Sequence, residues 1–171
     1  MSEAPGTPRN LFDRISLVIG RATAWLTLFM VLVTTVIVIM RYVFDAGMIW
    51  IQESVIWMHA AVFMLGASYT LLHEEHVRVD IFYRNMGPRR QAVVDLFGVI
   101  VFLLPLCGYL ALAAYDFAAV SWSIREASRE PGGLPYPMIP MLKSVVVIMP
   151  VLVALQGVSM MMRSLATLRR K

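Results

Sequence analysis

The sequence predicts an all-α integral membrane protein with four transmembrane helices, both termini in the cytoplasm and a single membrane domain over residues 1–171. The chain is 59% hydrophobic and 15% charged, with a mean hydropathy of +0.71, which is too apolar for an ordinary soluble domain. Four segments without Asp, Glu, Lys or Arg each have close to the roughly 20 residues that cross a hydrocarbon core of about 30 Å. They are residues 22–40, 54–72, 96–115 and 144–162.

The positions of the basic residues predict the orientation. Most of the 15 Lys and Arg residues lie before the first apolar segment, between the second and the third, or after the fourth. Because basic residues near spanning helices favour the cytoplasmic side, we expect both termini and the connection at 73–90 there. The loop at 116–143 is then periplasmic, and the net charge of +4 needs no explanation by nucleic-acid binding.

Residues 8–20, which precede the first apolar segment, show a helical pattern. Thr7 followed by Pro8 is typical of a helix start. We expect a short amphipathic helix in the cytoplasmic interface, and an upstream extension of the first spanning helix fits the pattern equally well. Apolar residues take one side and charged residues largely the other: Leu11, Phe12, Ile15, Val18 and Ile19 against Arg9, Asp13, Arg14 and Arg21.

The first apolar segment is interpreted as a retained helix. It is longer than the roughly 7 to 15 residues of a signal-peptide core, and Arg41 follows it without a small-residue cleavage site. The short turn at residues 45–47 predicts that the second helix packs antiparallel to the first.

His59 is the one histidine inside an apolar segment. It lies four residues from the central Phe63, about 6 Å in depth at 1.5 Å per residue. We interpret it as a neutral imidazole bonded to a neighbouring helix. After this segment the sequence allows either a short extended stretch or the start of an interfacial helix, until Gly87 and Pro88 break it.

The third segment contains Pro105 and Gly108, which allow a bend where neighbouring groups satisfy the freed carbonyl. We expect this helix to continue past Asp116 toward Trp122. Prolines and glycines then crowd residues 131–140, which predicts a shaped loop without a regular element.

The residue pattern gives no support for an enzyme, a metal site or a cofactor site. Cys107 is the single cysteine, which excludes an intrachain disulfide and a thiolate cluster. The histidines lack the spacing of a zinc protease helix, and there is no phosphate loop, dinucleotide fingerprint or nucleophile elbow. The centres of the four segments are apolar, whereas secondary transporters place polar groups or broken helices there. We infer a protein that packs against a partner.

Several short motifs follow one another in a fixed order along the four segments. They are Arg41-Tyr42-Val43-Phe44, Trp50 with Glu53, Gly66-Ala67-Ser68, His76-Val77-Arg78-Val79-Asp80, Ser121 with Glu126 and Ser128, Gly132-Gly133-Leu134-Pro135, Lys143, Pro150 and Gln156-Gly157. In this order they resemble the small, four-helix, DctQ-like membrane subunit of the tripartite ATP-independent periplasmic (TRAP) transporters. The family often has two adjacent acids after the tryptophan, and here the first of them is Gln52.

The resemblance implies a complex in the bacterial inner membrane. The partners are a large, DctM-like membrane subunit, which carries solute and sodium, and a DctP-like periplasmic receptor, which delivers the solute, commonly a carboxylate. The small subunit is then an accessory scaffold that braces the large one and helps to dock the receptor. On this interpretation the solute is chosen by the partners.

The resemblance also implies roles for particular residues. Arg41, Trp50 and Glu53 are expected to set the periplasmic end of the first helix pair, with Arg41 and Glu53 either paired or separately solvated. We expect His76, Arg78 and Asp80 to pin the cytoplasmic connection or contact the large subunit, against the alternative of a solvated loop. The residues expected to shape the periplasmic loop near the receptor, against the alternative of ordinary loop closure, are Glu126, Ser128, Gly132, Gly133, Pro135 and Lys143.

Two other classes of function compete with the accessory scaffold. A small proton-coupled exporter would act as a homodimer and lose transport when Glu53 is neutralised. A haem-anchoring subunit would purify coloured and lose its colour with His59→Ala.

Overall fold

The computed structural model describes residues 10–73, 83 and 85–169, and this part of the chain is all-α. Four continuous helices are long and apolar enough to cross a membrane, which confirms the predicted number of spans. One of the four contains a π-helical turn and is divided into α4, η1 and α5. The elements are α1 Leu11–Val43, α2 Ile49–Leu72, α4 Pro88–Gly98, η1 Val99–Leu103, α5 Leu104–Ser123 and α6 Met138–Arg169.

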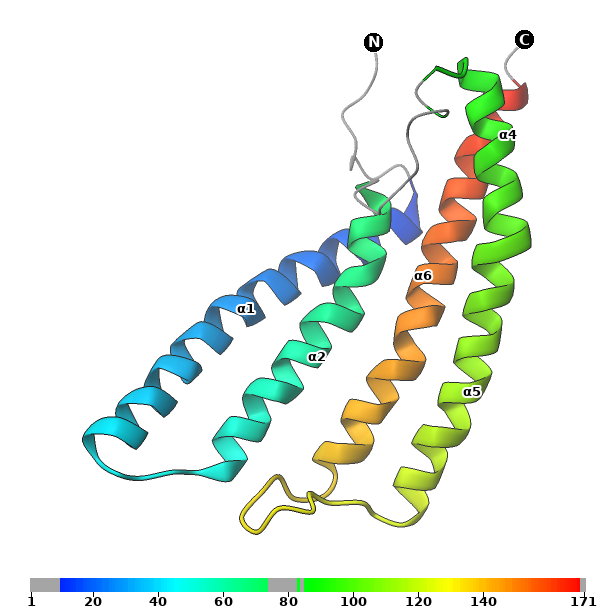
Figure 1. Cartoon of the computed structure of the whole chain (residues 1–171). Coiled ribbons are helices and arrows are strands. Elements are labelled where there is room, and N and C mark those ends of the chain that lie inside the picture. The colour runs from blue at the N-terminus through cyan, green and yellow to red at the C-terminus, as the bar shows by residue number, and fades with distance from the viewer. Residues whose placement is uncertain (1–9, 74–82, 84, 170–171) are drawn as a thin grey trace.

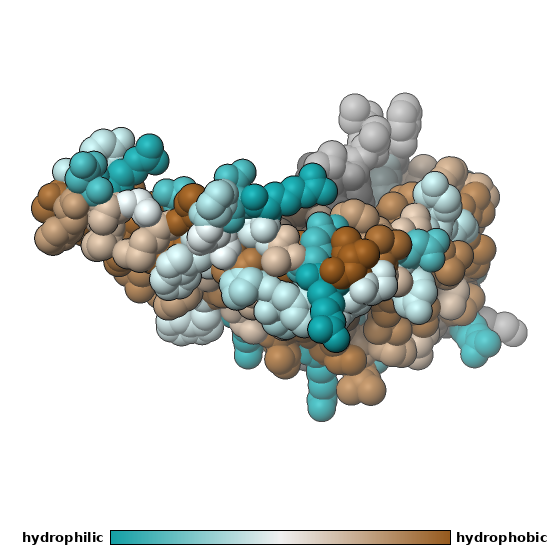
Figure 2. Space-filling model, turned by 90° about the horizontal axis from the view of Figure 1, so that it is seen from below, coloured by the Kyte–Doolittle hydropathy of each residue, from teal (hydrophilic) through white to brown (hydrophobic). Residues whose placement is uncertain are grey.

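The helices lie side by side in the order α1, α2, α6, α5, as two antiparallel pairs (Figure 1). The first turns of α1 also reach α6, so the pairs meet where α1 begins and spread toward the end that carries the loop between α5 and α6 (Figure 1). Figure 2 looks at the loop end and shows an elongated outline, with hydrophilic residues across this end and hydrophobic residues along its borders. The molecule is a splayed layer of helices.

Because a single layer leaves both faces of each helix uncovered, many large apolar side chains are exposed. Trp25 of α1, Phe63 of α2 and Leu112 of α5 are each 74% exposed. In a bilayer such side chains contact lipid tails or another membrane protein. The fold therefore offers apolar surface to a partner along every helix.

Helix α1 runs without a break from Leu11 to Val43. The separate amphipathic helix expected over 8–20 is not seen in the described residues, and the alternative, an upstream extension of the first spanning helix, fits the structure. The prediction that the charged side of this helix faces water is wrong for Asp13, which is fully buried. No proline interrupts this stretch, and Gly20 lies where α1 crosses α2: a Cβ there would stand 2.1 Å from Cδ2 of Tyr69. The first turns of α1 are therefore buried against α2 and α6. The hydropathy pattern of α1 alone does not contain this contact.

The expected bend in the third helix takes the form of a π-helical turn. Pro105 has no N–H to donate to the preceding turn, and directly before it the N–H of Leu104 donates to the carbonyl of Val99, five residues back. Such a turn widens the helix locally. It also brings Leu103 against Gly157 of α6, where a Cβ would stand 2.5 Å from Cδ2 of Leu103.

The loop between α5 and α6 covers residues 124–137, less than the expected 116–143. Helix α5 continues past Asp116 to Ser123, as expected, and Pro140 falls in the first turn of α6, where proline is tolerated. At the other end of the molecule, α4 begins at Pro88 after Gly87. Residues 74–82 and 84 of the connection before it lie outside the described residues.

Candidate functional site: two polar clamps

Glu53 of α2 holds the loop between α5 and α6. Its carboxylate accepts hydrogen bonds from the hydroxyl of Ser128 and, at 2.6 Å, from the backbone N–H of Leu134. The N–H of Ser128 donates to the carbonyl of Leu134 at 3.0 Å, which closes the loop on itself. We call Glu53, Ser128 and Leu134 the loop-end clamp. It joins the α1 and α2 pair to the α5 and α6 pair at the end where the pairs are spread.

Two glycines allow this close approach. Gly132 has a φ of 78°, a left-handed conformation that favours glycine. At Gly133 a Cβ would stand 2.3 Å from Oγ of Ser128 and 2.7 Å from Oε2 of Glu53. The Gly-Gly-Leu-Pro segment named in the sequence thus brings the Leu134 N–H to the carboxylate, and the following Pro135 carbonyl accepts the N–H of Met138 as α6 begins.

A second carboxylate, that of Glu126, fixes both ends of the same loop. Nζ of Lys143 lies 2.5 Å from Oε2 of Glu126, and the hydroxyl of Ser121 donates to the same oxygen at 2.6 Å. Lys143 also lies over the ring of Phe117, 4.2 Å from its centroid. The hydrogen bond from Lys143, followed by that from Ser121, lowers the pKa of Glu126 below its ordinary value of 4.5. These bonds tie the last turn of α5 to the first turns of α6.

Trp57 adds a link that the sequence analysis did not identify. Its indole N–H donates to the carbonyl of Met138 at 3.1 Å, which joins α2 directly to the first residue of α6. The signal in the sequence is a tryptophan about two turns inside α2, because the tryptophan side chain has one polar atom to satisfy.

The other residues expected at this end take no part in the loop-end clamp. Arg41 and Trp50 are exposed, Trp50 by 51%. Among the described residues, no ion pair is found between Arg41 and Glu53. The carboxylate of Glu53 is instead bonded to Ser128 and Leu134. His76, Arg78 and Asp80 lie outside the described residues.

Where α1 begins, a buried polar network joins it to the middle and second half of α6. The carboxylate of Asp13 accepts hydrogen bonds from Nε2 of Gln156 at 3.0 Å and from the hydroxyl of Ser159 at 2.6 Å. Ser16 donates to Oε1 of Gln156 at 3.0 Å, and the Asn10 amide donates to Ser159 at 2.7 Å. We call Asp13, Gln156 and Ser159, which are all fully buried, the terminal clamp. It closes the molecule where the two helix pairs converge.

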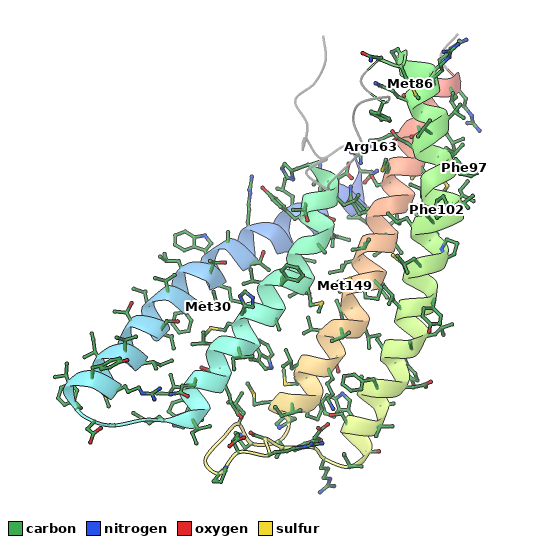
Figure 3. The ribbon with its side chains drawn as sticks, in the orientation of Figure 1. Met30, Met86, Phe97, Phe102, Met149 and Arg163 are labelled. Carbon is green, nitrogen blue, oxygen red and sulfur yellow. The ribbon has the colours of Figure 1, made fainter. Side chains whose placement is uncertain are left out.

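Arg163 stands at the edge of the terminal clamp (Figure 3). Its Nη1 lies 3.8 Å from Oδ2 of Asp13, and its side chain is 25% exposed. The sequence does carry a signal for this network: Asp13, Ser16, Gly20 and Thr23, the buried residues of α1, are small or polar and recur at helical spacing. Such a stripe marks a face that packs closely on another helix.

The chemistry available to both clamps is hydrogen bonding between helices. Across the described ranges, no buried side-chain nitrogen or oxygen lacks a partner. In the same residues, no group of three His, Cys, Asp or Glu side chains could hold a metal ion. The contacts found in both clamps are hydrogen bonds that join one helix to another or to the loop.

Comparison with known proteins gives the family. The model of the DctQ component of the tripartite ATP-independent periplasmic transporters matches residues 30–167, far more than half of the chain. A relative from Vibrio cholerae serotype O1, the C4-dicarboxylate TRAP transporter small permease protein DctQ, is 36% identical over 61 residues. That match covers 36% of this chain and 26% of the relative. No solved structure matches. The matched range includes both carboxylates of the loop end and Gln156 of the terminal clamp, and the chain belongs to the DctQ family, the small permease subunits of TRAP transporters.

Proposed function

We propose that this chain is the accessory scaffold subunit of a sodium-coupled TRAP transporter in the bacterial inner membrane, and that it braces the large, DctM-like subunit. The observation that carries this proposal is the position of the polar contacts. Glu53 lies near the start of α2 and Asp13 near the start of α1, and Gln156, near the middle of α6, is fully buried and bonded to Asp13 and Ser16. The residues at the centres of the first two apolar segments, Val31 and Phe63, are apolar and exposed. A scaffold needs fixed helices and an apolar outer surface, and a carrier needs polar groups at mid-depth.

The rigid loop supports a role in docking the periplasmic receptor. Residues 124–137 are held by Glu53 from α2 and by the pair of Glu126 with Lys143, so that the loop presents a fixed surface. Arg125, Arg129 and Glu130 are exposed on it. With the termini in the cytoplasm, as the basic residues favour, this loop faces the periplasm, where a DctP-like receptor approaches.

One relative supports the proposed solute class. The curated relative is described as a small permease for C4-dicarboxylates, which supports a small carboxylate as the cargo of the complex. In the scaffold role, none of the solute's contacts need come from this chain.

The alternative of a proton-coupled exporter that acts through Glu53 is not favoured. A proton carrier needs a carboxylate that is open to the transport path, and the carboxylate of Glu53 is occupied by Ser128 and the Leu134 N–H. The two oxygens act here as hydrogen-bond acceptors in a structural contact.

The experiment is solute uptake in cells that express the receptor and the large subunit with or without this chain. We expect sodium-dependent uptake of a small carboxylate with all three proteins and its loss when this chain is omitted. Uptake that is unaffected by the omission would contradict the proposal.

A further inference from the structure

We propose that a groove between α1 and α2, beside His59, receives a transmembrane helix of the large subunit, which presents a neutral hydrogen-bonding side chain to the imidazole. This inference rests on the proposed function and adds the site of contact and the chemistry that recognises the partner.

The groove lies on one face of the first helix pair. The α1 wall consists of Met30, Val31, Thr34 and Thr35, and the α2 wall of Val55 and Ile56 with His59. Figure 3 shows Met30 on the side of α1 toward α2. The walls are almost entirely apolar and open sideways, so the space suits an apolar helix surface better than a polar solute.

His59 is the polar group that lipid leaves unsatisfied. It is exposed, and no hydrogen bond joins its ring to any of the residues that the structure describes. It follows Glu53 by six residues along α2, about 9 Å deeper at 1.5 Å per residue. At that depth the bilayer offers no water, and a polar group without a partner is costly. An occupant with a hydrogen-bonding side chain removes this cost.

The two threonines opposite His59 do not fill this role. The hydroxyl of Thr34 donates to the carbonyl of Met30 at 2.8 Å, and that of Thr35 donates to the carbonyl of Val31 at 2.9 Å. The hydroxyl protons of both threonines are therefore used within α1, although their hydroxyl oxygens can still accept a hydrogen bond. An incoming side chain that both donates and accepts, such as an amide or a hydroxyl, can bond to the imidazole and to a threonine oxygen together.

A membrane partner is a better occupant than lipid. A lipid tail brings no hydrogen-bonding group to the depth of His59, and a headgroup stays at the interface. A second copy would bring a second His59 and the same threonines, and the crosslink described below separates it from the large subunit. Membership of a family of tripartite transporters supplies a different membrane protein as the occupant. The side chain of Met30 is flexible, so the groove can adapt to the shape of an incoming helix. The methyl groups of the threonines suit contact with small residues on that helix.

The test uses a photoreactive amino acid, benzoylphenylalanine, in the chain co-expressed with the large subunit. It replaces Ile56, which lines the groove and is 65% exposed, or Leu112 of α5, which is 74% exposed and remote from it. We expect a crosslink to the large subunit from position 56 and none from position 112. A crosslink from position 112 alone, or a dimer of this chain from position 56, would overturn the inference.

The hydrogen bond is tested separately with His59→Phe and His59→Gln. We expect His59→Phe to lower the yield of large subunit recovered with the tagged chain at least fivefold, and His59→Gln to restore most of it, because the amide both donates and accepts. Tm of the isolated chain should be the same for both variants, since His59 has no described partner within it. Equal recovery with all three chains would refute the role of His59, while failure of the unsubstituted chain to recover the large subunit would instead refute the proposed function.

Discussion

The carboxylate of Glu53 accepts the backbone N–H of Leu134 at 2.6 Å, across 81 positions of sequence, and so connects the start of α2 to the loop before α6. The α1 and α2 pair spreads away from the α5 and α6 pair toward this end of the molecule (Figure 1). The contacts of Glu53 therefore join the two pairs at the end where they spread apart. This is what a scaffold subunit requires, since its partner must meet a surface of constant shape.

Replacing Glu53 by alanine should loosen that contact. The change leaves the Ser128 hydroxyl and the Leu134 N–H without their acceptor, and we expect a loss of about 1–3 kcal/mol in the free energy of unfolding. Thermal unfolding in detergent measures it. The neighbouring Gln52→Ala is the matched control and should change stability by less than about 0.5 kcal/mol; equal effects at the two positions would contradict the loop-end clamp.

Gly133→Ala should act on the same contact from the loop side. The added methyl group would stand 2.3 Å from Oγ of Ser128 and 2.7 Å from Oε2 of Glu53, so the loop must move away from α2. We expect faster proteolysis within residues 124–137 and a loss of about 1–3 kcal/mol, the range for overpacked sites. Gly47→Ala, where the methyl group would meet nothing within 4 Å, should leave both measurements unchanged.

Asp13→Ala should weaken the contact between the start of α1 and α6. Gln156 and Ser159 lose an acceptor in a fully buried site, and we expect a loss of about 1–3 kcal/mol. A double-mutant cycle with Gln156→Ala should give a coupling energy of about 0.5–3 kcal/mol, as for residues in one network. Strict additivity of the two changes would show that Asp13 and Gln156 stabilise the fold independently, and would contradict the network. The control for a charge change on α1 is Arg14→Ala, at an exposed position.

Acid should weaken the contact between Glu126 and Lys143. Because the pKa of Glu126 is lower in the folded chain than its ordinary 4.5, the carboxylate adds stability above pH 4.5 and that contribution is lost as the pH falls through the lowered folded pKa. We expect the difference in Tm between the unsubstituted chain and Glu126→Gln to be constant above pH 4.5 and to shrink as the pH falls through the lowered pKa of Glu126. A difference that grows with acidification would have the wrong sign.

The sequence predicted the four spans and missed most of the contacts that hold them together. Hydropathy reports length and depth, so helix number and the position of Glu53 near one end followed directly. The hydrogen-bond partners of Glu53 could not be predicted, because they depend on how residues 128–134 fold back against a helix far away in sequence. Asp13 was expected to face water because the amphipathic pattern considers one helix alone, whereas its burial depends on α6. The roles of His76, Arg78 and Asp80 stay predictions.

The central claim is that this chain assembles with a large membrane subunit, and affinity purification tests it most directly. The tagged chain is co-expressed with the large subunit and purified in mild detergent, and the composition of the product is measured. The scaffold function predicts that the two proteins elute together at a fixed ratio, and that the Glu53→Ala and Gly133→Ala variants recover less of the large subunit than Gln52→Ala does. Recovery of each protein alone, from membranes that contain both in folded form, would contradict the account.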